Sequence, residues 1–105
     1  MNAEDNGHGT YKVQPVGSVG ADLRRFHKQL MHHGKGAAFR NVVREVYGRL
    51  RSDPRAFGET LYRLPALKLL VHQGIISPLV VTYGVHDELP LVFIHVVKLL
   101  SNPEK

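Results

Sequence analysis

Apolar residues recur at helical spacing in two stretches of the first half of the chain. The first stretch places four of them on one face: Leu23, Phe26, Leu30 and Met31. We expect Asp22 or Ser18 to cap this helix and Gly34 to end it. The second stretch carries a longer set at the same spacing: Phe39, Val42, Val43, Val46, Tyr47 and Leu50. It should end at Asp53, because the residue before a proline is pushed out of the helical region. Two antiparallel amphipathic helices are therefore predicted.

The second half is patterned as strands. Residues 67–72, 79–85 and 91–97 are rich in Val, Ile and Leu, and turn signals at Gly74, at Ser77-Pro78 and within 86–90 separate them. The last two segments should pair as an antiparallel hairpin, with one face directed at the helices: Leu79, Val81, Tyr83 and Val85. A short strand is also expected within residues 11–19.

These elements together predict the α+β class, with two amino-terminal helices packed on a mainly antiparallel sheet of about four strands in the order β-α-α-β-β-β. With 105 residues, the chain should form a single domain over residues 11–105, preceded by a disordered tail at 1–10. The chain has no cysteine, which excludes disulfides, thiolate zinc sites and cysteine nucleophiles. No secretory signal is evident, and charged residues interrupt the apolar stretch 79–100, so we expect a cytoplasmic protein that does not enter a membrane.

The charge is unevenly distributed. Residues 1–51 hold nine Lys or Arg against four Asp or Glu, whereas residues 52–105 hold five of each. Such a field favours nucleic acid or an acidic protein, although a solvated helix face would have the same composition. The candidate binding residues lie on the two helices: Arg24, Arg25, Lys28, Arg40, Arg44 and Arg51.

Four segments in this order resemble the RelE/ParE toxin superfamily: RSDPRAFGE at 51–59, LYRL at 61–64, PLVVTYGVHDE at 78–88 and VFIHVV at 92–97. The resemblance spans residues 11–100. It implies a component of a toxin–antitoxin system, held in check by an antitoxin protein. Family members either cleave messenger RNA on the ribosome or poison a DNA topoisomerase.

The residues that this resemblance assigns to RNA cleavage are only partly present. Lys68 falls where the family places a basic group, and Tyr83 matches the strand tyrosine. The family's arginine position is apolar here, within residues 79–81, and Lys98-Leu99-Leu100 follows the last strand in place of a lysine-arginine pair. The match therefore leaves two functions open, a ribosome-dependent endoribonuclease and a catalytically inactive RelE/ParE-fold protein that acts through protein contacts.

Cleavage by the RNA's own 2′-hydroxyl needs a base, an acid and a charge that stabilises the phosphate. Lys68 and His72 are four residues apart on one predicted strand and should share a face, with Tyr83 nearby, so these three are the candidate catalytic residues. His95 is a further candidate. For His95 and Tyr83 the alternative is a place in the core, because their strand neighbours are apolar.

No cofactor or metal is expected. The adjacent pair His32-His33 points in two directions on a helix and cannot chelate one ion alone, and the phosphate-loop, hydrolase and metalloprotease motifs are absent. The expected partners are an antitoxin protein and, for a nuclease, the ribosome or RNA.

Overall fold

The computed structural model describes residues 10–100 as a five-stranded sheet with helices on one face. The elements in chain order are β1 (Lys12–Pro15), α2 (Val19–Met31), α3 (Gly36–Ser52), α4 (Pro54–Phe57), β2 (Glu59–Leu64), the 3-10 helix η1 (Pro65–Leu67), β3 (Leu69–Ile76), β4 (Leu79–His86) and β5 (Leu91–Leu99). The strand order is β1-β5-β4-β3-β2, and the only parallel pair among these strands is β1 with β5. The α+β class is confirmed, with five strands in a mixed sheet rather than about four.

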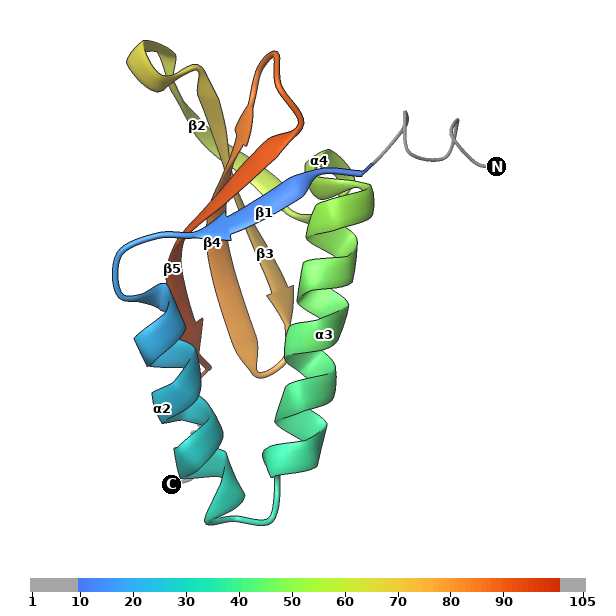
Figure 1. Ribbon diagram of the computed structural model, residues 1–105, viewed down its shortest axis with the longest axis vertical. Coiled ribbons are helices and arrows are strands. Elements are labelled where there is room, and N and C mark those ends of the chain that lie inside the picture. Colours follow the sequence, from blue (N-terminus) through green and yellow to red (C-terminus); the bar gives the residue numbers. More distant parts are fainter. Residues whose placement is uncertain (1–9, 101–105) are drawn as a thin grey trace.

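Helices α2 and α3 form a hairpin that runs along the sheet (Figure 1). Gly34 in the connecting loop has a φ of +72°, a conformation that favours glycine. The predicted cap is wrong in detail. Ser18 occupies the N-cap position, but its hydroxyl donates to Asp22 Oδ2 at 2.9 Å, and no side chain caps a backbone N–H there.

The core lies between this hairpin and the sheet. The predicted strand face is buried against the helices, with Val81 and Tyr83 at its centre. From the helices, Phe26, Val46 and Leu50 complete the same cluster. The alternation along β4 therefore identified the core face correctly.

Strand β2 was not predicted, and Gly74 was misassigned. Gly74 lies inside β3, which begins at Leu69 and continues to Ile76, so the turn expected at this glycine is wrong. A glycine is required there because the ring of Phe57 occupies the space that a Cβ would fill. Strand β2 pairs with β3 at the sheet edge and is exposed along most of its length, so its sequence lacks the apolar pattern of a buried strand.

A β-bulge in the β4–β5 pairing changes the pattern of β5. Tyr83 pairs with Ile94, whereas the adjacent Thr82 pairs with Val96, so His95 has no direct partner. As a result Val97 is buried in the core. Strict alternation would place Val97 on the same face as His95, but the bulge puts the two residues on opposite faces.

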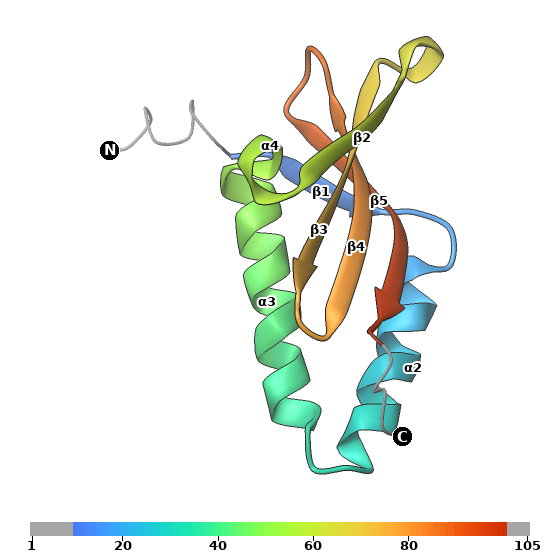
Figure 2. The ribbon, with the colours of Figure 1, turned by 180° about the vertical axis from the view of Figure 1, so that it is seen from behind.

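Strand β2, η1 and the turn between β4 and β5 project beyond the helices, at the end opposite the α2–α3 loop (Figure 2). We refer to this projection as the lobe. Apart from Thr10, the expected disordered tail lies outside the described residues. No helix within residues 10–100 has the length and apolar character needed to cross a membrane.

Candidate functional site

Lys68 does not share a strand face with His72, so that prediction is wrong. It follows η1 directly, has a φ of 58° and precedes β3. Its Nζ lies 3.4 Å from Glu88 Oε1, and its carbonyl accepts the N–H of Asp87 at 2.8 Å. Arg63, on β2 in the lobe, donates to both carboxylate oxygens of Asp87 at 2.7 Å. Both basic side chains therefore contact the β4–β5 turn.

His72 and Tyr83 are brought together, but inside the core. Their rings stack with centroids 5.4 Å apart, and their exposed fractions are 2% and 0%. The hydroxyl of Tyr83 donates to the carbonyl of Pro54 at 2.6 Å, and burial raises the pKa of Tyr83 to about 12. Burial also lowers the pKa of His72, which disfavours its charged form. Neither side chain is accessible to a bound RNA.

His95 lies on the other face of the sheet. A Cβ placed on Gly84 would lie 3.3 Å from the His95 ring, and Gly84 alternates with the core residue Tyr83. The His95 ring is half-buried, and this burial lowers its pKa. The sheet therefore separates His95 from His72, and the two imidazoles cannot act as an acid–base pair on one substrate.

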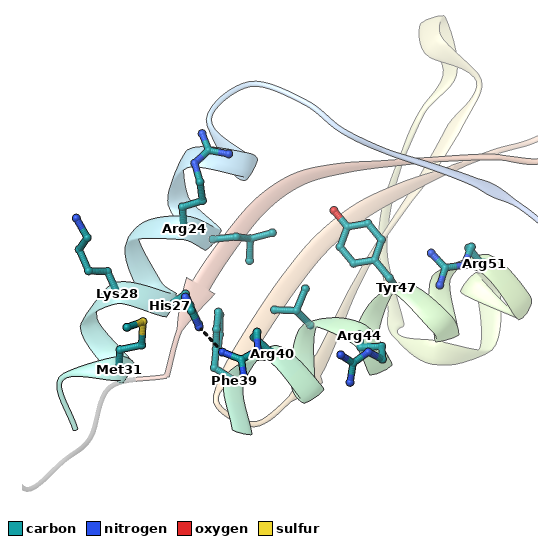
Figure 3. Close-up of a pocket in the computed structure, with 11 residues that line it drawn as sticks. Arg24, His27, Lys28, Met31, Phe39, Arg40, Arg44, Tyr47 and Arg51 are labelled. Carbon is teal, nitrogen blue, oxygen red and sulfur yellow. Dashed lines mark hydrogen bonds between the residues drawn. The ribbon is translucent and has the colours of Figure 1, made fainter. Parts of the chain in front are cut away.

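A groove of about 720 Å³ runs between α2 and α3. Its floor is mainly apolar, formed by Leu23, Met31, Phe39, Val43 and Tyr47. Its basic residues come from both helices, Arg24 and Lys28 from α2 and Arg40, Arg44 and Arg51 from α3 (Figure 3). No Asp or Glu is among the described residues that line it. We call this the helical groove.

One hydrogen bond crosses the helical groove. A guanidinium nitrogen of Arg40 on α3 lies 3.2 Å from Nε2 of His27 on α2 (Figure 3). The His27 ring also stacks on Phe39, with centroids 6.4 Å apart and an interplanar angle of 28°. Burial raises the pKa of Tyr47 further along the floor, and the charge of Arg51 partly offsets this effect.

Five of the six predicted binding residues line the helical groove: Arg24, Lys28, Arg40, Arg44 and Arg51. Arg25 does not, and instead pairs with Asp22 at 2.8 Å. Within residues 10–100, the salt bridges use Arg25, Arg49, Arg63 and Lys68, so the five groove cations take part in none of them. The sequence located these charges but did not reveal the apolar floor, because residues such as Val43 fit equally well as ordinary core positions.

The part of the chain that the structure describes contains no group of three or more His, Cys, Asp or Glu side chains that could hold a metal ion. Fold and site together define an α+β protein with a basic, apolar-floored groove on its helical face. No protein-family model, curated protein or solved structure matches the chain.

Proposed function

We propose that this protein acts by binding an acidic segment of a partner protein in the helical groove, as a toxin-like RelE/ParE-type component that works through protein contacts. The observation that carries this proposal is the combination of cations on both walls with an apolar floor. An amphipathic segment with acidic flanks could bury apolar side chains on the floor and pair its carboxylates with the walls. A cognate antitoxin is the partner that the sequence resemblance implies.

The apolar floor favours a protein partner over a nucleic acid. Phosphate contacts would use the arginines, but Leu23, Met31 and Val43 offer a sugar-phosphate backbone nothing to bind. A second copy of this chain is also disfavoured, because apposing two such grooves would bring like charges together. An acidic amphipathic segment can bury apolar side chains on the floor and pair its carboxylates with the cations of both walls.

The alternative, RNA cleavage on the ribosome, has less support. Its candidate base and tyrosine are buried, and its candidate lysine is paired with Glu88. A reaction at phosphorus needs these groups on an accessible surface, with a cation near the developing charge. Induced expression in a growing bacterium, with reporter messages mapped for cuts, tests this alternative. We expect no cleavage, and efficient cleavage would overturn a purely binding role.

The binding proposal is tested with a synthetic peptide that carries a leucine stripe flanked by aspartates. Arg40→Glu combined with Arg44→Glu should weaken peptide binding about tenfold or more in fluorescence anisotropy. The matched control combines Arg25→Glu with Arg49→Glu, which changes the net charge equally but alters side chains that do not line the groove. Equal losses in both double variants, or tighter binding of a single-stranded RNA than of the peptide, would contradict the proposal.

A further inference from the structure

The hydrogen bond between Arg40 and His27 joins the two walls of the helical groove with an unusual acceptor. Guanidinium groups have no acceptor atom, so Nε2 of His27 must accept from Arg40 and carries no proton in this arrangement. The imidazole is held in orientation by its stacking on Phe39. A neutral imidazole nitrogen is a weaker acceptor for a guanidinium than a carboxylate, which binds this group with charge assistance.

The surroundings of His27 contain several cations. Arg24 and Lys28 on α2 and Arg40 and Arg44 on α3 line the same groove, Arg40 contacts the ring directly, and no carboxylate lines the groove within residues 10–100. The titratable Tyr47 lies on the same floor. In the empty groove, Nε2 of His27 is used as the acceptor for Arg40, a role that a protonated Nε2 could not fill.

We propose that Arg40 and His27 form a carboxylate-binding subsite, in which an acidic side chain of the partner takes the place of the imidazole as the acceptor for Arg40 and His27 takes up one proton. Nε2 then becomes a second donor to the same carboxylate, so donors from both helices converge on one acid. The proton comes from solvent, and no bond is made or broken apart from the N–H. This proposal rests on the proposed function of the helical groove, to which it adds a defined ligand group and a proton.

The consequence is that partner binding depends on pH in a way that ordinary charge attraction does not. Imidazole is the side chain whose protonation falls nearest to neutral pH. Aspartates of the partner stay ionised well below neutrality, so the additional proton belongs to the protein. One linked proton changes affinity by at most about tenfold per pH unit.

The experiment measures binding of the aspartate-flanked peptide at about pH 7.5 and about pH 5.5. For the wild-type chain we expect about tenfold tighter binding at the lower pH. His27→Gln keeps an acceptor for Arg40 but cannot take up a proton, so its affinity should change by less than about twofold. His33→Gln is the matched control, because His33 is exposed and does not line the helical groove, and it should behave as wild type.

A second measurement does not depend on a variant. Isothermal titration of the wild-type chain near neutral pH, in buffers of different ionisation enthalpy, should show uptake of protons when the peptide binds. Absence of proton uptake, or a His27→Gln variant with the full pH dependence, would overturn the subsite while leaving the groove as a binding site. No peptide binding at either pH would overturn both the subsite and the proposed function.

Discussion

The fit between Phe57 and Gly74 gives a sharp test of how the core is built. Gly74 lies in the middle of β3, opposite Val81. A Cβ added there would lie 2.7 Å and 2.8 Å from the Cδ2 and Cζ atoms of Phe57, whereas carbon atoms normally keep about 3.5 to 4.0 Å apart. The Phe57 ring stacks on Tyr83 with centroids 5.9 Å apart, so a movement of the ring away from Gly74 would disturb that stack.

Gly74→Ala should therefore destabilise the fold by about 2 kcal/mol, a typical cost of overpacking. This loss would occur although alanine restricts the unfolded chain more than glycine does, which alone would stabilise the protein. The assay is equilibrium unfolding in urea. Gly48→Ala is the control, since apart from its chain neighbours and the backbone of its own helix no atom of the described residues lies within 4 Å of its Cβ position. It sits inside α3, so the substitution should stabilise by about 0.5 to 1 kcal/mol.

A double-mutant cycle identifies the cause of the loss. In the background of Phe57→Ala the clash is absent, so Gly74→Ala should cost little or nothing. The coupling between the two substitutions should then exceed about 1 kcal/mol. If the two losses simply add, or if Gly74→Ala unfolds at the wild-type urea concentration, Phe57 does not occupy this space in solution.

Three further outcomes follow from the core. Val46→Asp places an unpaired charge at a side chain that is 1% exposed and should cost at least about 3 kcal/mol, so a variant with wild-type melting would contradict burial of this helix face. Tyr83→Phe leaves the carbonyl of Pro54 without its donor and should cost about 1 to 3 kcal/mol in urea unfolding, and no loss would mean that water or another donor replaces the hydroxyl. Burial lowers the pKa of His72, so the unfolded chain binds its proton at a higher pH than the folded one, and stability should fall as the pH drops below about 6.5. Thermal melts of wild type and His72→Leu at several pH values should show a smaller acid-induced loss in the variant, and equal slopes would show that His72 does not cause it.

The sequence predicted the strongly periodic elements and missed those shaped by packing. Strand β4 alternates cleanly, and its core face was assigned correctly. Gly74 was interpreted as a turn because a glycine that accommodates a ring from a distant residue looks, in sequence, like a glycine that bends the chain. The bulge at His95 was equally hidden, since nothing local distinguishes a bulged residue from its neighbours in an apolar strand.

The predicted arrangement of the catalytic candidates was wrong for a related reason. Lys68 and His72 are four residues apart, which implies a shared face only if one strand contains both. Here η1 ends at Leu67, and Lys68 adopts a left-handed conformation before the strand begins. The alternative for Tyr83, a place in the core, is the one that the structure supports. Its ring and that of His72 form a buried stack, in which the Tyr83 hydroxyl is hydrogen-bonded to the carbonyl of Pro54 and Nε2 of His72 has no partner among the described residues.

The ion pairs of the lobe bear on where unpaired positive charge remains in the protein. Arg63 and Lys68 are paired with Asp87 and Glu88, so two acidic residues of the second half are paired with bases of the second half. Within residues 10–100 neither of these acids pairs with a cation of α2 or α3, and the lobe projects beyond the helices (Figure 1). No acid lines the helical groove within residues 10–100. Much of the excess positive charge of the first half therefore lies around a groove with an apolar floor. A charged helix face without an apolar floor would gain little binding free energy, because solvent and salt screen exposed charges. In the helical groove, a partner segment would pair its carboxylates with the cations and cover the apolar floor at the same time.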